Sequence, residues 1–361
     1  MTLNSHGNPT MWSKLTVWCS VLLVVSSGFM HAQEPTQQEE TEFVEGPKLK
    51  WNISLWGGPR PGTKIADSIS EKLDFYTNGN WEFKLHYGEG LSKPRENLDG
   101  IAIKAFEAAM ICNIYHPQKN PALMVMSLPF LPLGDWEDRI AVREVLYDTE
   151  PVKKEFKRWG AMIYTSSFLP RYEVMGRGEA PFSLDDWKGK IVRAAGGFGD
   201  VLKKLGATPS GMAAPEVYTG IQTGSIDAVA FPFTYSHVSY RIHEVSSWFT
   251  TNLSLGTADC PIVFSIEAYN KLPQQYRDLL ARIKPDVIEE QRQAYVTADT
   301  ENLPMLREKL IEITYSEEDL EQFRARFGRV VIEEWIEENS DDFDARELVE
   351  LVFKAVGKEY K

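Results

Sequence analysis

Apolar and polar residues follow one another along the first part of the chain in a pattern that predicts alternating strands and helices. Residues 48–56 alternate as a strand does, and residues 63–76 carry apolar side chains at helical spacing. A strand at 81–86, a helix near 95–106 and an apolar strand at 108–114 follow. Strands that alternate with helices predict a parallel or mixed sheet with both faces covered.

The remaining pattern predicts a second sheet region and then a helical C-terminal region. A strand near 161–168 leads out of the first region, and an apolar strand at 261–266 marks the return to it. From Pro273 onward the apolar spacing is helical. A capping-box sequence at Ser316–Asp319 begins one more helix, and the last helix is expected at 344–360.

Residues 185–232 contain a short strand, a glycine cluster and a helix in that order. The strand ends at Arg193, and Gly196, Gly197 and Gly199 come directly after it. Free N–H groups at the start of a helix can hold an anion. An arginine beside them adds a bidentate donor that suits a carboxylate. The residues alone indicate an anion site, with a surface arginine beside a flexible loop as the simpler alternative.

Composition and charge narrow the classes of function. A chain of 361 residues with 43% hydrophobic and 12% aromatic residues is long enough for two compact lobes. The formal net charge of −13 argues against nucleic acid or an anionic membrane surface as the partner. An acidic protein that binds an acid must concentrate positive charge locally, which draws attention to Arg193.

The N-terminus predicts export. Lys14 precedes an apolar run at 15–29, and polar residues resume at Gln33, so residues 1–32 are expected to be a signal peptide. A retained signal anchor is the alternative. Residues 33–47 are polar and acidic and are expected to form a disordered tether. The expected location is therefore the periplasm.

Two cysteines, Cys112 and Cys260, remain after the expected leader is removed. They could pair in an oxidising compartment, or they could be two buried free thiols, and the sequence does not decide between these. Cys112 and His116 are four residues apart and could be considered as a catalytic nucleophile and its base. However, the segment between them leaves a strand for a loop, and this spacing does not align the two side chains there. Zinc-site spacings, a nucleophile elbow and a phosphate-binding loop do not occur in the sequence. We therefore expect no catalytic residue, no metal and no cofactor.

The stretch from Ser183 to Asp227 resembles the signature region of solute-binding proteins of tripartite ATP-independent periplasmic (TRAP) transporters, the DctP-type family. The resemblance extends weakly over residues 48–355. In the signature itself nearly all spacings of the family pattern are kept. The matching positions are 183–193, Gly206, Ala207, Thr208, Pro209, Met212, Glu216, Val217, Tyr218, Ile221, Gln222, Gly224 and Asp227.

The resemblance implies an α/β fold of the two-lobe periplasmic binding protein (Venus-flytrap) type, with mixed sheets, crossing hinge strands and a helical C-terminal region. Lobe I is expected from 48–168 plus 256–295, and lobe II with the C-terminal helices from 169–255 plus 296–361. A small organic anion would bind between the lobes, which close by hinge motion. The receptor would deliver it to the TRAP membrane subunits. A receptor of an ATP-driven importer and a secreted enzyme are the alternatives.

Arg193 stands at the arginine that holds the ligand carboxylate in the family, which makes it the leading candidate for ligand binding. Phe231 stands where many members have asparagine or tryptophan before proline, so an apolar surface replaces a polar contact. Ala214 stands where some sialic-acid-binding relatives have phenylalanine, which widens the expected pocket. These departures favour a monocarboxylate with an apolar portion, or a 2-oxo or 2-hydroxy acid, over a sugar acid.

The other candidates lie at strand ends and crossings. Trp56 ends the first strand, and Tyr115 and His116 follow a strand whose carboxyl end is the usual place for a ligand. Arg171 lies on the crossing into the second lobe. Asp259 lies beside the return crossing, either orienting the ligand or serving as a hinge acid. Tyr218 completes the set of candidates, with packing as its alternative role.

Overall fold

The computed structural model describes residues 42–360. The expected signal peptide, 1–32, and residues 33–41 of the expected tether lie outside the described residues. The end of that tether is held on the body of the protein, because the Val44 N–H donates to the Tyr76 carbonyl over 2.8 Å.

The first sheet is mixed and has five strands in the order β2–β1–β3–β10–β4. Strand β1 runs parallel to β2 and β3, whereas β10 runs antiparallel to β3 and β4. The strands are β1 (Leu49–Ser54), β2 (Trp81–His86), β3 (Ala108–Met110), β4 (Ala161–Ser166) and β10 (Pro261–Ser265). We call this sheet and the helices that cover it lobe I.

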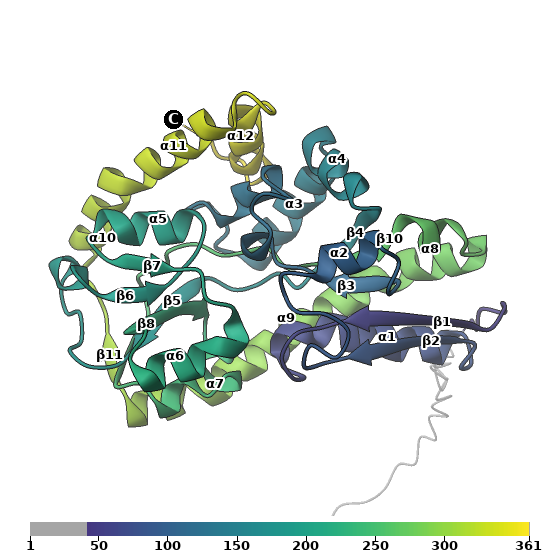
Figure 1. Cartoon of the computed structure of the whole chain (residues 1–361), viewed down its shortest axis with the longest axis horizontal. Coiled ribbons are helices and arrows are strands. Elements are labelled where there is room, and N and C mark those ends of the chain that lie inside the picture. Colours follow the sequence, from purple (N-terminus) through teal and green to yellow (C-terminus); the bar gives the residue numbers. More distant parts are fainter. Residues whose placement is uncertain (1–41, 361) are drawn as a thin grey trace, which may run out of the picture. The chain divides into compact units, whose positions relative to one another are not determined.

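The second sheet is also mixed and has six strands in the order β11–β9–β5–β8–β6–β7. Strand β6 runs parallel to β7 and β8, and β5 runs antiparallel to β8 and β9. The strands are β5 (Tyr172–Gly176), β6 (Ile191–Arg193), β7 (Thr208–Ser210), β8 (Ala228–Pro232), β9 (Trp248–Thr250) and β11 (Ile311–Ile313). This sheet and its helices form lobe II (Figure 1).

Helices cover both sheets, as the alternating pattern predicts. In the chain's first half the α-helices are α1 (Lys64–Tyr76), α2 (Asn97–Ala102), α3 (Trp136–Tyr147) and α4 (Glu150–Arg158). In the second sheet region they are α5 (Gly197–Lys204), α6 (Val217–Thr223) and α7 (Tyr235–Ser239). The remaining helices are α8 (Ile266–Asn270), α9 (Gln274–Lys309), α10 (Glu317–Phe323), α11 (Arg329–Asn339) and α12 (Ala345–Ala355).

The chain crosses between the two sheets from β4 to β5 and again from β9 to β10. Helix α9 passes both lobes, since it packs on α1 and on α7 (Figure 1). It is continuous through Pro285 and Pro304 and across the boundary expected near residue 295. Two crossings and one shared helix connect the lobes, and one cluster of buried hydrophobic side chains extends through both of them.

Strand β3 is shorter than the expected strand at 108–114. After Met110 the chain bends into a 3-10 turn at Asn113–Tyr115. The Asn113 side chain drives the bend, because its Oδ1 accepts hydrogen bonds from the Ile114 and Asp259 N–H groups at 2.8 and 3.1 Å. This turn places Tyr115 beyond the carboxyl end of the strand.

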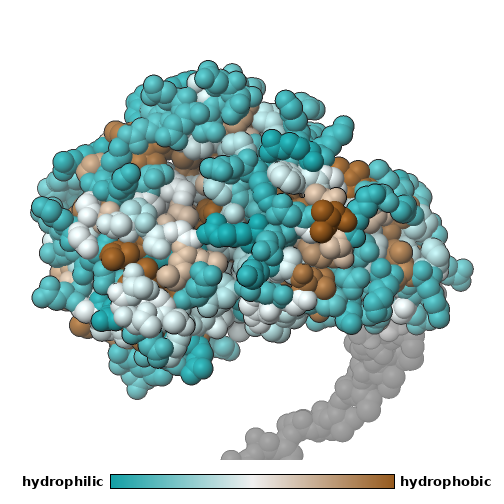
Figure 2. All heavy atoms as spheres, in the orientation of Figure 1, coloured by the Kyte–Doolittle hydropathy of each residue, from teal (hydrophilic) through white to brown (hydrophobic). Residues whose placement is uncertain are grey.

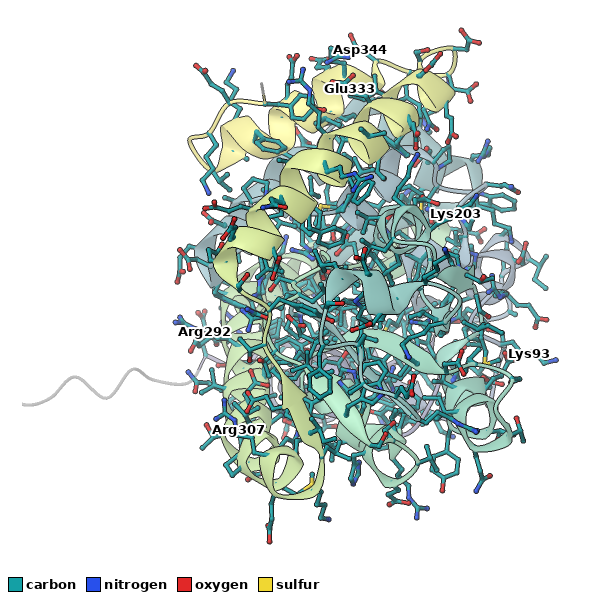
Figure 3. The ribbon with its side chains drawn as sticks, turned by 90° about the vertical axis from the view of Figure 1, so that its left-hand side faces the viewer. Lys93, Lys203, Arg292, Arg307, Glu333 and Asp344 are labelled. Carbon is teal, nitrogen blue, oxygen red and sulfur yellow. A yellow bond between two sulfur atoms is a disulfide. The ribbon has the colours of Figure 1, made fainter. Side chains whose placement is uncertain are left out.

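The C-terminal helices connect the two lobes on another side. Helix α11 packs on α5 of lobe II, whereas α12 packs on α3 of lobe I. Asp344 caps α12 by accepting from the Glu347 N–H at 2.9 Å, and Glu333 of α11 pairs with Arg346 of α12 at 2.5 Å (Figure 3). The helix expected from residue 316 is present as α10 and α11 joined by a π-helical turn.

The surface in Figure 2 is largely hydrophilic, with small and separate hydrophobic patches. Among residues 42–360, no helix has both the length and the apolar character needed to cross a bilayer. The two mixed sheets and their covering helices confirm the predicted α/β class.

Candidate ligand-binding site

Arg193 lies at the end of β6, and only 2% of its surface is exposed. Its Nε donates to the Met212 carbonyl at 2.8 Å and its Nη1 to the Ala230 carbonyl at 3.2 Å. These two bonds fix the plane of the guanidinium against the neighbouring strand and loop. Its carbon also lies 4.9 Å from the centre of the Phe231 ring, within reach of a cation–π interaction.

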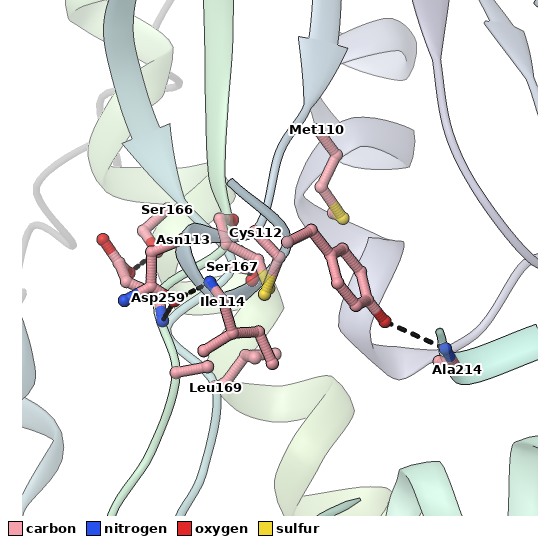
Figure 4. The surroundings of a disulfide bond; sticks show 12 residues. Met110, Cys112, Asn113, Ile114, Ser166, Ser167, Leu169, Ala214 and Asp259 are labelled. Atoms are coloured by element: carbon pink, nitrogen blue, oxygen red, sulfur yellow. Dashed lines mark hydrogen bonds between the residues drawn. A yellow bond between two sulfur atoms is a disulfide. The ribbon is translucent and has the colours of Figure 1, made fainter. Parts of the chain in front are cut away.

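Tyr115 reaches across from lobe I to the same guanidinium. Its hydroxyl oxygen accepts a hydrogen bond from Arg193 Nη2 at 3.3 Å. It accepts another from the Ala214 N–H at 3.0 Å, drawn as a dashed line in Figure 4. A guanidinium has five N–H donors, so these contacts leave two for a ligand. The Tyr115 hydroxyl oxygen accepts from Arg193 as an oxygen of a ligand carboxylate would.

Trp56 and Arg60 form the opposite wall. Arg60 lies in the turn after β1, where its Nη1 donates to the Trp56 carbonyl at 2.6 Å and the Gly58 carbonyl at 2.9 Å. Its guanidinium carbon lies 5.7 Å from the Trp56 ring and 5.5 Å from the Tyr240 ring. Trp56 also meets the Tyr115 ring edge-on, with 5.6 Å between ring centres. A second cation therefore borders the site.

Three tyrosines complete the wall: Tyr172 and Tyr235 are buried, and Tyr240 is half-buried. Burial raises the pKa of Tyr240 to about 12 and that of Tyr172 well above its ordinary value. Both phenols therefore stay protonated at neutral pH and can donate hydrogen bonds. The Tyr240 hydroxyl is buried and has no partner among the described residues.

These side chains enclose a cavity of about 30 Å³ between the two lobes. That volume holds about two water molecules. An organic acid with a ring would need more room, so its binding requires the lobes to separate or Tyr115 to move. The four sequence candidates that line this cavity are Trp56, Tyr115, Arg193 and Phe231.

The glycine cluster has a different role from the predicted anion cradle. A side chain at Gly196 would lie 2.4 Å from Ser127 Oγ, and one at Gly197 would lie 2.8 Å from the Leu128 backbone. The start of α5 therefore packs directly against lobe I. None of the three clustered glycines lines the cavity. Of the donors predicted in residues 185–232, the helix N–H groups and Arg193, only Arg193 lies at the cavity.

Asp259, a sequence candidate, is fully buried outside the cavity. Its carboxylate accepts from Arg143 Nε at 2.7 Å, Ser166 Oγ at 2.7 Å and the Tyr147 hydroxyl at 2.5 Å. All three partners belong to lobe I. The two carboxylate oxygens of Asp259 therefore accept hydrogen bonds from buried side chains of lobe I, Arg143 among them.

The other three candidates also lie outside the cavity lining. His116 is buried, and neither ring nitrogen has a hydrogen-bond partner among residues 42–360. Burial lowers its pKa to about 4. Arg171 is more than half exposed and donates to the Thr251 carbonyl at 3.1 Å. Tyr218 lies under the guanidinium of Arg241, 5.9 Å from its carbon.

Cys112 and Cys260 form a disulfide that lines the cavity on the lobe I side (Figure 4). The open question from the sequence is thereby answered in favour of pairing. The bridge joins the chain after β3 to the chain before β10. Among residues 42–360 no group of His, Cys, Asp and Glu side chains could hold a metal ion.

Arg60 and the three tyrosines were not identified from the sequence. The signal for Arg60 was its place in the glycine-proline turn beside Trp56. Tyr235 and Tyr240 belong to α7 and its end, and no motif in the sequence connects them with the cavity. Only the packing of α7 against the lobes brings these hydroxyls to it.

Residues 59–338 match the family model described as bacterial extracellular solute-binding protein, family 7. The match covers most of the chain, so this protein belongs to that family, the DctP family of the predicted resemblance. Both the two-lobe fold and the family assignment are confirmed.

Individual relatives are distant. A solute-binding protein of Albidiferax ferrireducens is 24% identical over 61% of this chain and 65% of its own length, so the match spans just under two thirds of that relative. A monocarboxylate 2-oxoacid-binding periplasmic protein of Nostoc is 20% identical over 67% of each. A TRAP solute-binding protein of Rhodoferax ferrireducens, solved with copurified benzoate, has a TM-score of 0.75 at 18% identity, covering 85% of this chain and 97% of that one.

Proposed function

We propose that this protein is an extracytoplasmic solute receptor that captures a small organic acid between its lobes and delivers it to the membrane subunits of a TRAP-type transporter. The observation that carries the proposal is the buried Arg193 at the interface of the lobes, with two N–H donors left for a ligand. A buried guanidinium that faces a cavity is suited to a carboxylate.

The walls favour an acid with an apolar body. Trp56, Phe231 and the disulfide present carbon and sulfur surface around the charged end of the site. Two relatives support this preference, since one binds monocarboxylate 2-oxoacids and another was solved with benzoate. We therefore place the substrate among monocarboxylates with an apolar portion and 2-oxo or 2-hydroxy acids.

Release into the periplasm by a signal peptide at residues 1–32 belongs to the same proposal. The family membership supports an extracellular location and favours a TRAP partner over an ATP-driven importer. It likewise favours a binding protein over a secreted enzyme.

A thermal-shift screen against organic acids tests the proposal. An acid at 100 times its dissociation constant adds about 2.7 kcal/mol of stability, which raises the melting temperature by a few degrees. The panel should include benzoate, 2-oxo acids, 2-hydroxy acids and sugar acids. A panel without any shift contradicts the proposal, and turnover of a binding acid, detected by mass analysis, establishes an enzyme instead.

A further inference from the structure

Lobe I contains a second hollow, which we call the α3–α4 groove. It lies between α3, α4, the edge strand β4 and α9, and has a volume of about 450 Å³. No residue lines both this groove and the cavity that holds Arg193. The groove is therefore a separate site, large enough for a small molecule without any movement of the lobes.

Most of the groove is apolar. Aliphatic side chains come from α3, β4 and α9, and aromatic ones from α4, β4 and the chain that follows β4. Representative lining residues are Ile140, Phe156, Ile163, Tyr164, Phe168 and Ile288. This surface suits the hydrocarbon part of a ligand.

Two residues of the groove lining, Arg143 and Thr165, each have a buried donor without a partner among the described residues. Arg143 is 1% exposed; its Nε is bound to Asp259 and its Nη1 to the Arg139 carbonyl, but its Nη2 has no partner among the described residues. The buried hydroxyl of Thr165 lacks a partner as well. Leaving buried donors unpaired is unfavourable, so this part of the groove lining is suited to an acceptor atom.

Lys284 supplies a positive charge at the same groove. It is half-buried on α9, and within the described residues no carboxylate oxygen lies within 4 Å of its Nζ, which stands 6.0 Å from the Tyr164 ring centre. Desolvation lowers its pKa, although Glu144 at the groove opposes this. Asp148, the other acid of the lining, is already paired with Lys153 at 2.5 Å.

We propose that the α3–α4 groove is a second binding site for a small organic anion with an apolar body, such as a medium-chain carboxylate. The carboxylate interacts with Lys284 and accepts from the unpaired donors of Arg143 and Thr165, while the hydrocarbon chain lies on the aliphatic and aromatic wall. The site does not depend on the ligand of the interlobe cavity, and it stands whether or not that ligand is an acid.

Calorimetric titration of the purified protein with octanoate tests the groove, with neutral octanamide as the comparison. Three variants locate the binding. Lys284→Gln removes one positive charge from the groove lining. Ile288→Trp, one helical turn away on the same face of α9, fills the groove without changing charge. Lys154→Gln, an exposed lysine of α4 outside the groove lining, is the control for loss of one positive charge.

We expect one octanoate site whose affinity falls about fivefold in Lys284→Gln and more in Ile288→Trp, stays unchanged in Lys154→Gln, and survives in Arg193→Gln. Octanamide should bind more weakly than octanoate. Absence of octanoate binding at millimolar concentration overturns the proposal. So does binding that disappears in Arg193→Gln but is unaffected by both groove variants, since octanoate then occupies the interlobe cavity.

Discussion

The hydroxyl oxygen of Tyr115 lies 3.3 Å from Nη2 of Arg193, so a phenol of lobe I contacts the guanidinium that we assign to the ligand carboxylate. The same oxygen accepts from the Ala214 N–H. An incoming acid can bind the two N–H donors of Arg193 that remain, or displace Tyr115 to reach the third. The contact also joins the two lobes directly.

Tyr115→Phe should tighten acid binding by about fivefold, because the acid no longer competes with the phenol for Arg193 and Ala214. The variant without acid should lose about 1–3 kcal/mol of unfolding free energy, because two hydrogen bonds are removed and each contributes about 0.5–1.5 kcal/mol. Titration calorimetry and denaturant unfolding measure the two quantities. Weaker acid binding in the variant would mean that the hydroxyl contacts the ligand rather than competes with it.

Phe231→Asn should shift specificity from apolar towards polar acids. The ring lies against the Arg193 guanidinium, and replacing it with an amide removes an apolar wall and adds polar groups. We expect the ratio of benzoate to sugar-acid affinity to fall about tenfold, and stability to fall by about 2–4 kcal/mol through the smaller side chain. Phe233→Asn, outside the cavity lining, is the control, and an equal change of ratio there would contradict this role.

Asp259→Asn should destabilise the protein without changing which acid it binds. The change weakens the pairing of the buried Arg143, and breaking a buried ion pair costs about 3–5 kcal/mol. Denaturant unfolding measures this loss, and titration of the folded variant should give an affinity within about twofold of the original protein. A large loss of affinity at unchanged stability would make Asp259 a ligand contact after all.

Glu155 should make stability depend on pH. Its carboxylate accepts from the Ala122 N–H at 2.6 Å, and burial raises its pKa from 4.5 to about 7. A raised folded-state pKa means that the folded protein binds the proton more tightly, so stability is highest below pH 4.5 and falls as the pH rises to about 7.

The loss between these pH values should be about 3 kcal/mol at most, by 1.36 kcal/mol per pKa unit. Unfolding curves at a series of pH values measure it, and Glu155→Gln should flatten the profile in that window. The exposed Glu150→Gln on the same helix is the matched control. An unchanged slope in Glu155→Gln assigns the pH dependence to other groups.

The sequence predicted the element order well because local patterns determine it. Alternation at 48–56 and helical spacing at 63–76 reflect one buried face each, and both elements form there. The strand at 108–114 was predicted too long. A side chain, Asn113, ends it by bonding to the neighbouring segment, and such a contact cannot be read from periodicity.

The candidate site likewise contains residues that a local sequence motif predicts and residues that only the packing of the fold brings to the cavity. Arg193 could be proposed from a motif that fixes its place at a strand end beside a loop. Arg60 and Tyr240 could not, because they reach the cavity only through the packing of a turn and a short helix. His116 is next to Tyr115 in sequence, yet it does not line the cavity. Tyr115 and His116 differ in the direction of their side chains, which their positions along the chain do not reveal.

Titration calorimetry of the best-binding acid with Arg193→Gln tests the central claim most directly. The exposed Arg177→Gln of the same lobe is the control, and circular dichroism verifies that both variants are folded. We predict that Arg193→Gln weakens binding at least about a hundredfold through loss of charged hydrogen bonds, whereas Arg177→Gln changes it less than twofold. An acid that binds the folded Arg193→Gln variant with unchanged affinity would contradict the account.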